Sequence, residues 1–203
     1  MNIFKDLEIA IFSYNRGKYL KNCIDSAKKN LPGIKIRIFD DNSNAPNTVE
    51  YLKSLGDLVI WAEESNTSRH GNLYSNMQLA LDQCATKFLL LLQDDLQVIR
   101  PVNQQDIANI KAIFSDPNIA FLRPQLMKSG DKEKNLSLLR PSEKLRAYTP
   151  DSEYKDNTYG HSYCDVVLCD VKKLRNNSWT FLNIERENQI QAHTIFRYMP
   201  FMA

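Results

Sequence analysis

Residues 88–95 read Phe88-Leu89-Leu90-Leu91-Leu92-Gln93-Asp94-Asp95, five apolar residues followed at once by an amide and two carboxylates. A short run that is apolar at every position is typical of a central parallel strand, which is buried on both faces. Polar residues that directly follow such a strand lie at the carboxyl end of the sheet, where ligands bind in open α/β folds. This stretch therefore predicts a parallel sheet and the place of its site.

Short β-rich runs alternate with amphipathic stretches through the first 124 residues, which is the rhythm of βαβ units. The expected strands span residues 8–13, 34–39, 58–62, 88–92 and 119–123. Helices are expected near 19–27, 48–55, 73–84 and 107–114. Residues 125–158 are charged and irregular, with a hairpin or loop at 128–134, and a strand at 163–169 and helices at 170–174 and 187–196 follow. We predict one Rossmann-like mixed sheet flanked by helices.

Composition narrows the class of protein. A chain of 203 residues suits one well-filled domain, and 26 Lys and Arg against 24 Asp and Glu, spread along the chain, do not indicate nucleic acid. The four cysteines never form a C-x-x-C pair, so we expect reduced, mostly buried thiols. Residues 1–8 lack the apolar stretch of a signal peptide, and no apolar run approaches the roughly 20 residues of a membrane span. We expect a cytoplasmic protein.

Polar clusters follow three of the expected strands: residues 12–16 (Phe-Ser-Tyr-Asn-Arg), 40–43 (Asp-Asp-Asn-Ser) and 93–95 (Gln-Asp-Asp). The adjacent carboxylates Asp94 and Asp95 repel each other unless a cation or a hydrogen-bond donor stabilises them. Mg²⁺ and Mn²⁺ prefer oxygen ligands and bind through one or two carboxylates plus substrate phosphates. We therefore predict a divalent metal site at Asp94 and Asp95.

Each cluster also has a purely structural interpretation. An aspartate after a strand often caps the next turn, and Asp40 to Ser43 has the composition of an ordinary turn. Tyr14 at a strand end is as well suited to packing as to stacking on a base, and an isolated loop arginine such as Arg69 is usually solvated. The order of the clusters along the chain favours the functional interpretation.

Read in sequence, residues 9–16, 40–43, 72–81 and 90–95 resemble the nucleotide-sugar half of GT-A glycosyltransferases, above all those of family 2. The resemblance covers about residues 8–124 and is weak afterwards. It implies the GT-A fold and a metal-dependent transferase that moves a hexose or deoxyhexose from a UDP-sugar to a glycan or glycoprotein. A narrower resemblance, to algal-virus glycosyltransferases that act on the major capsid protein, implies a viral protein working in the host cytoplasm.

The family pattern implies a role for several residues of this chain. It places Phe12 and Tyr14 against the uridine, beside Ser13 and Arg16 of the same segment. It makes Asp41 the acceptor for N3 of the base and brings Arg69 to the nucleotide. Asp94 is expected at the ribose or at a metal-bound water, and Asp95 as the direct ligand of Mn²⁺ or Mg²⁺. Gln93 stands where many relatives have another acid.

The position of the catalytic base is less regular. In inverting relatives a carboxylate well beyond the metal motif takes the proton of the acceptor hydroxyl, and Glu187 stands at the corresponding place, with Glu185 as its competitor. The surrounding Ile184-Glu185-Arg186-Glu187-Asn188 departs from the usual Glu-Asp pair, which leaves inverting and retaining outcomes open. The structural interpretation is that both acids favour the start of a helix through its macrodipole.

Two further functions stay open. A module that kept the nucleotide-sugar fold and lost transfer fits the irregular Glu187 region, whereas a sugar nucleotidyltransferase is disfavoured because residues 13–18 contain only Gly17. We expect a nucleotide and metal half at 1–124 and an acceptor half at 125–203. The apolar ending at 197–203 leads us to expect the N-terminal module of a longer protein with further domains.

Overall fold

The computed structural model describes residues 5–62, 71–124, 139–142, 147–150, 161–196 and 198–202. The chain divides into two compact units, Met1–Asn103 and Gln104–Ala203. Parallel strands and helices alternate in the first unit, and antiparallel strand pairs occur in the second. The predicted α/β class is confirmed.

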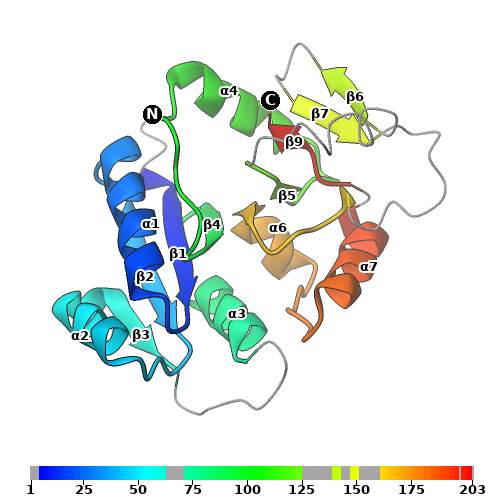
Figure 1. Ribbon diagram of the computed structural model, residues 1–203. Coiled ribbons are helices and arrows are strands. Elements are labelled where there is room, and N and C mark those ends of the chain that lie inside the picture. The colour runs from blue at the N-terminus through cyan, green and yellow to red at the C-terminus, as the bar shows by residue number, and fades with distance from the viewer. Residues whose placement is uncertain are drawn as a thin grey trace. The chain divides into compact units, whose positions relative to one another are not determined.

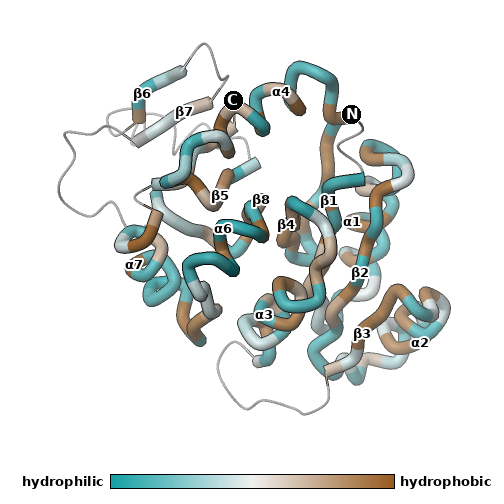
Figure 2. Tube along the Cα trace, turned by 180° about the vertical axis from the view of Figure 1, so that it is seen from behind, coloured by the Kyte–Doolittle hydropathy of each residue, from teal (hydrophilic) through white to brown (hydrophobic). Residues whose placement is uncertain are grey.

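Four parallel strands form the sheet of the first unit, in the order β3-β2-β1-β4. Their bounds are Leu7–Ser13 for β1, Lys35–Asp40 for β2, Val59–Trp61 for β3 and Phe88–Gln93 for β4. Every residue of β1 is buried, as are all the apolar residues of β4, which is drawn in the hydrophobic colour in Figure 2. The all-apolar run that predicts a central strand thus forms one.

Helices cover both faces of these strands. They are α1 (Gly17–Asn30), α2 (Pro46–Ser54) and α3 (Leu73–Gln83), and a short 3-10 helix, η2 (Gly56–Leu58), precedes β3. The chain steps outward from β1 to β3 and then returns past β1 to β4. Because βαβ crossovers are right-handed, α1 and α2 lie on one face and α3 on the other, as Figure 1 shows.

The apolar faces of the helices explain how they pack. In α1, Leu20, Cys23, Ile24 and Ala27 recur at helical spacing, and all four are buried. Pro46 occupies the first turn of α2, where its missing N–H is not needed. The apolar periodicity thus predicts α1, and the proline marks the start of α2.

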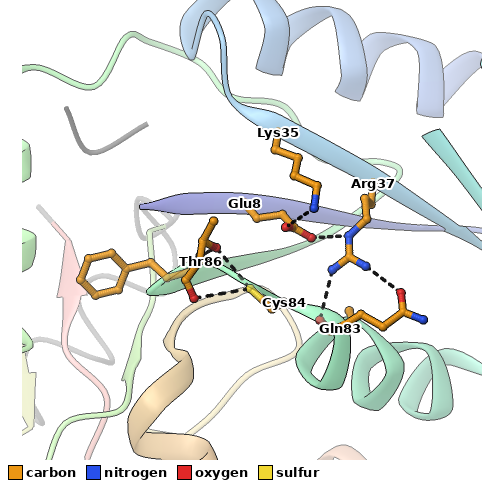
Figure 3. Close-up of polar contacts among 8 residues, drawn as sticks. Glu8, Lys35, Arg37, Gln83, Cys84 and Thr86 are labelled. Carbon is orange, nitrogen blue, oxygen red and sulfur yellow. Dashed lines mark hydrogen bonds and ion pairs between the residues drawn. The ribbon is translucent and has the colours of Figure 1, made fainter. Parts of the chain in front are cut away.

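A buried carboxylate marks the opposite end of β1 from the candidate site. Glu8 is fully buried and forms ion pairs with Arg37 and, at 3.0 Å, with Lys35, both from β2 (Figure 3). Arg37 also donates to Gln83 Oε1 at 2.7 Å, at the end of α3. Glu8 lies five residues before Ser13, about 17 Å along an extended strand. This cluster joins β1, β2 and α3 away from the carboxyl edge.

The second unit contains two antiparallel strand arrangements. Strand β5 (Phe121–Leu122) pairs with β8 (Val167–Asp170), and β6 (Leu139–Ser142), β7 (Ala147–Pro150) and β9 (Phe201–Met202) form a sheet in the order β6-β7-β9. Its helices are α4 (Gln104–Ile113), α6 (Val171–Asn176) and α7 (Glu185–Phe196). The Phe121 ring contacts three other aromatic rings edge to face, with centroid distances of 5.2 Å to Tyr163, 5.0 Å to Trp179 and 5.6 Å to Phe196. This aromatic cluster lies in the core of the second unit.

Expectation and structure differ most in the second unit. The irregular segment contains the strands β6 and β7, which the sequence does not reveal because β6 reads Leu-Arg-Pro-Ser and buries only Leu139. The predicted strand at 163–169 begins only at Val167. The predicted hairpin or loop at 128–134 falls outside the described residues.

Two expectations from composition agree with the structure. All four cysteines are free thiols, with Cys23, Cys84 and Cys169 buried and Cys164 half-buried. In the described ranges, every helix is too short or too polar to cross a bilayer.

Candidate functional site

Backbone hydrogen bonds bring two of the predicted clusters to the end of β1. The Asp41 N–H donates to the Ser13 carbonyl at 2.9 Å, and the Asp94 N–H donates to the Phe12 carbonyl at 3.1 Å. β1 lies between β2 and β4, so Asp41 arrives from one side and Asp94 from the other. The parallel register therefore assembles residues that are far apart in the sequence.

Asp94 and Asp95 converge on one cation, the guanidinium of Arg16. Arg16 Nη1 lies 2.9 Å from Asp95 Oδ2 and 3.6 Å from Asp94 Oδ1. The Asp94 side chain is 5% exposed, whereas those of Asp95 and Arg16 are 42% and 53% exposed. The pair thus combines a buried carboxylate with one open to ligands, and a positive charge stabilises both, as the sequence led us to expect of adjacent acids.

The electrostatics of the pair follow from its burial. Burial raises the pKa of Asp94, and the Tyr14 N–H, the Arg16 charge and the Ser13 hydroxyl partly offset this effect. Burial also raises the pKa of the Cys23 thiol to about 12, and the negative charges of Asp94 and Asp95 add to this rise. The two carboxylates therefore make this edge of the sheet electronegative, so a second positive charge would be stabilised there.

Asp40 has a structural role in the turn after β2. It is fully buried and accepts hydrogen bonds from the N–H and the hydroxyl of Ser43, at 2.7 and 2.6 Å. Ser43 Oγ in turn accepts from the Asn15 N–H at 2.8 Å. Burial raises the pKa of Asp40 despite the donors of Ser43. The turn interpretation thus applies to Asp40, which also ties the loops after β1 and β2 together.

Asn15 strengthens this connection and is a residue that the sequence did not single out for it. Its Oδ1 accepts from the N–H groups of Asn44 and Ala45, both at 2.8 Å, and its φ of 56° lies in the left-handed region. Asparagine tolerates this conformation better than most residues. Its place between Tyr14 and Arg16, at the sharp turn after a buried strand, was the available signal.

Asp41, in contrast to Asp40, is half-buried. Asn72, the residue before α3, donates to both of its oxygens, from the backbone N–H to Oδ2 at 3.0 Å and from Nδ2 to Oδ1 at 2.6 Å. A carboxylate has about four lone-pair sites, so these bonds leave Asp41 able to accept from a ligand.

The remaining candidates of the first unit differ in accessibility. The Tyr14 side chain is 53% exposed, and its N–H donates to Asp94 Oδ2 at 3.4 Å. Ser13 is buried, and so is Phe12, whose ring packs 5.7 Å from that of Phe39. Arg69 lies outside the described residues. Of the two aromatic residues, Tyr14 is the one that presents a ring to solvent.

Glu185 and Glu187 both occupy the first turn of α7, in the second unit. The Glu187 N–H donates to the Ile184 carbonyl at 3.0 Å. Acids in a first turn are favoured by the helix macrodipole, so the structural interpretation of these residues agrees with their location. Their role as a base stays a prediction.

The donor set at Asp94 and Asp95 fits a divalent ion that completes its coordination with ligand and water. Within the described ranges, His, Cys, Asp and Glu side chains form no group of three or more around one point. Two carboxylates that already converge on one cationic nitrogen do provide the one or two protein ligands that Mg²⁺ and Mn²⁺ usually take beside phosphate oxygens.

Comparison with known proteins identifies a matching sequence family and a set of solved structures with a similar fold. The sequence profile described as "Glycosyl transferase family 2" matches residues 8–172. No protein with a curated description matches the sequence significantly. The structural similarities below agree with the GT-A class expected from the sequence, and that prediction is confirmed.

Three solved structures illustrate the fold. TarS 1-349 of S. aureus in complex with UDP-GlcNAc shares 14% identity, with a TM-score of 0.62 over 97% of this chain and 56% of that chain. The mannosyltransferase PcManGT from Pyrobaculum calidifontis in complex with GDP-Man and Mn²⁺ shares 11%, with a TM-score of 0.61 over 98% and 54%. GalNAc-T7 with UDP, GalNAc and Mn²⁺ shares 14%, with a TM-score of 0.60 over 97% and 41%. The chain spans little more than half the length of TarS 1-349.

Proposed function

The chain belongs to glycosyl transferase family 2, and we propose that it is a hexosyltransferase that moves a hexose or deoxyhexose from a UDP-sugar to a glycan or glycoprotein acceptor. The observation that carries the proposal is the convergence of Asp94 and Asp95 on one positive charge, beside Asp41 at the end of β1. A nucleoside diphosphate needs a cation at its phosphates and a polar acceptor at its base, and this edge offers both.

We assign the metal to Asp95 as the direct ligand and to Asp94 as its buried partner. Asp95 is the more exposed of the two and can reach a ligand without moving the backbone. Bound there, Mn²⁺ or Mg²⁺ would act as a Lewis acid that stabilises the charge of the departing UDP. Arg16, already in contact with both carboxylates, would then be free to bind a phosphate oxygen.

Asp41 selects the base in this proposal. The Asp41 carboxylate accepts from the N3–H of uracil, and the exposed Tyr14 ring packs against the base, next to the buried Phe12 of β1. Ser13, at the end of β1, and Arg69, in the segment that precedes α3, complete the nucleotide site in this proposal. The solved complexes of similar fold contain UDP-GlcNAc in TarS, UDP in GalNAc-T7 and GDP-Man in PcManGT, so the fold accepts more than one base. The choice of UDP therefore depends on Asp41.

In an inverting reaction, Glu187 would take the proton of the acceptor hydroxyl as its oxygen bonds to the anomeric carbon and UDP departs. Glu185 is the competing base, two positions earlier in the same helical turn. A glycoprotein acceptor is the narrower form of the proposal, and a viral capsid glycoprotein is the narrowest, resting only on the sequence resemblance. Cytoplasmic location and further domains of the same chain belong to the same proposal.

Calorimetry of UDP, GDP and several UDP-sugars with and without Mn²⁺ tests this function. We expect UDP to bind at least tenfold more tightly with Mn²⁺, and this gain to be lost in Asp95→Ala. Asp57→Ala, which removes an exposed acid from η2, is the control. Equal binding with and without Mn²⁺, or an unchanged metal effect in Asp95→Ala, would overturn the metal assignment.

A non-catalytic nucleotide-sugar module is the second candidate, favoured by the irregular sequence around Glu187. The two are separated by following UDP release from each UDP-sugar with Mn²⁺ over hours. Slow release, accelerated by a glycan acceptor, supports the enzyme, whereas tight binding with an intact donor supports the module. Cleavage of a UDP-sugar by pyrophosphate into UTP and a sugar 1-phosphate would instead indicate a nucleotidyltransferase.

A further inference from the structure

Asp41 and Asn72 are joined by two hydrogen bonds, which is more than an incidental contact between loops provides. Asn72 donates hydrogen bonds to both oxygens of the Asp41 carboxylate. Its backbone N–H lies 3.0 Å from Oδ2, and its side-chain Nδ2 lies 2.6 Å from Oδ1. Two donors from one residue fix the plane of the carboxylate as well as its position. Asp41 is anchored at its other end by the bond from its own N–H to the Ser13 carbonyl at 2.9 Å.

The Asn72 side chain binds Asp41 instead of capping the helix that follows it. It occupies the N-cap position of α3, where asparagine usually accepts a hydrogen bond from the second or third residue of the helix. Its side chain makes no such cap bond, and its amide points to Asp41. The chain thus leaves out a cap worth about 1 kcal/mol at this helix.

Gly71 provides the space that this contact requires. Its φ is +57°, in the left-handed region, and a Cβ at this position would lie 2.0 Å from Asp41 Oδ2. A separation this short excludes any side chain unless Asp41 moves. The Gly71-Asn72 pair is therefore shaped around the Asp41 carboxylate from the side of α3.

We propose that Asn72 is a positioning residue that makes Asp41 selective for uridine. Because both oxygens are held, the carboxylate presents its remaining lone pairs in one direction, as an acceptor for an imide N–H. Uracil has this N–H at N3, whereas N3 of cytosine is an acceptor and would face the carboxylate with like polarity. A site built to pair with one donor rejects a ligand that lacks it. This inference rests on the proposed function, because it takes Asp41 as the residue that binds the base.

The test compares UDP with CDP, both with Mn²⁺, by calorimetry on the full chain. We expect the wild type to prefer UDP by at least tenfold, and Asn72→Ala to lose most of this preference through weaker UDP binding. Binding of inorganic pyrophosphate with Mn²⁺ should stay within about twofold of the wild type, because Asn72 does not act on the metal. Gln78→Ala, which removes another side-chain amide from α3, is the control.

Gly71→Ala provides a second, independent variant. It keeps the Asn72 side chain but places a Cβ against Asp41 Oδ2, so Asp41 must move and the UDP preference should be lost as well. Loss of the preference in both variants, with pyrophosphate binding intact, supports the inference. A wild type that binds UDP and CDP equally would overturn the assignment of Asp41 in the proposed function. A wild type that prefers UDP, with the preference retained in both variants, would overturn the role of Asn72 alone.

Discussion

Arg16 Nη1 lies 2.9 Å from Asp95 Oδ2, and the same nitrogen is 3.6 Å from Asp94. The two residues come from the ends of β1 and β4, and their pairing neutralises part of the charge of the adjacent acids. A divalent ion bound by these carboxylates would compete with the guanidinium for the same oxygens. Arg16 is therefore expected to oppose metal binding in the free protein and to assist diphosphate binding once the metal is bound.

This competition predicts opposite effects of one substitution. Arg16→Ala should bind Mn²⁺ about fivefold more tightly without nucleotide, because an exposed ion pair worth up to about 1 kcal/mol no longer has to break. The same variant should bind UDP in saturating Mn²⁺ more weakly. Electron paramagnetic resonance of free Mn²⁺ and calorimetry of UDP provide the two measurements.

Lys21→Ala is the control for the Arg16 experiment, because it removes a cation that pairs with Asp25 on the exposed face of α1. It should leave both affinities within about twofold of the wild type. If Arg16→Ala weakened the binding of Mn²⁺ to the free protein, the proposed competition would be incorrect.

Glu187→Gln tests the catalytic base. A positioned general base contributes about 10²- to 10⁴-fold, so we expect the rate of transfer to fall by that factor while UDP and Mn²⁺ binding stay unchanged. Glu185→Gln, in the same turn of α7, should retain most of the activity. The roles of the two residues would be exchanged if the losses were reversed, and equal retention of activity would point to a retaining mechanism.

The buried Asp40 predicts a distinct pH dependence of stability. Burial raises its pKa in the folded state, so the folded protein holds the proton more tightly than the unfolded chain does. The stabilisation from this carboxyl is complete below its ordinary value of 3.8 and is lost as the pH rises through the raised pKa. The free energy of unfolding of the wild type should therefore fall relative to that of Asp40→Asn as the pH is raised from 3.5 to neutrality, as measured in urea.

The control for Asp40 is Asp57→Asn, which removes one acid from the exposed surface of η2. A difference between the wild type and Asp40→Asn that stayed constant with pH, or that changed as it does for Asp57→Asn, would contradict the assignment to burial.

The Glu8 cluster predicts a loss of stability without a loss of ligand binding. Glu8 is fully buried and the Arg37 side chain is only 12% exposed, so Glu8→Ala leaves a largely buried charge unpaired and should lower the free energy of unfolding by about 3 kcal/mol. Lys35→Ala, at a side chain that is 56% exposed, should cost less than about 1 kcal/mol. Urea denaturation measures both values, and similar losses in the two variants would show that burial is not the cause.

Mn²⁺-dependent UDP binding by the Glu8→Ala protein completes this test. It should resemble that of the wild type below the denaturation midpoint, since the cluster lies at the other end of β1. A specific loss of UDP affinity at full folding would indicate coupling between the two ends of the sheet.

The sequence by itself determined the parallel core and the residues at its carboxyl edge. The five apolar residues 88–92, which precede Gln93, are best buried in a strand that is covered on both faces. The polar cluster after such a strand must lie at the carboxyl edge of the sheet. The helical spacing of apolar residues in α1 likewise follows from local periodicity. These features depend on near neighbours in the chain, which is why they can be predicted without a structure.

Tertiary structure alone decided which of these polar residues act on one another. It separated Asp40, buried on Ser43, from its neighbour Asp41, which faces Asn72. It also brought Arg16 to Asp95, 79 positions away. Such contacts are set by the order and register of the strands. Strand order and register depend on how whole helices pack against the sheet, which cannot be read from any single segment of the sequence.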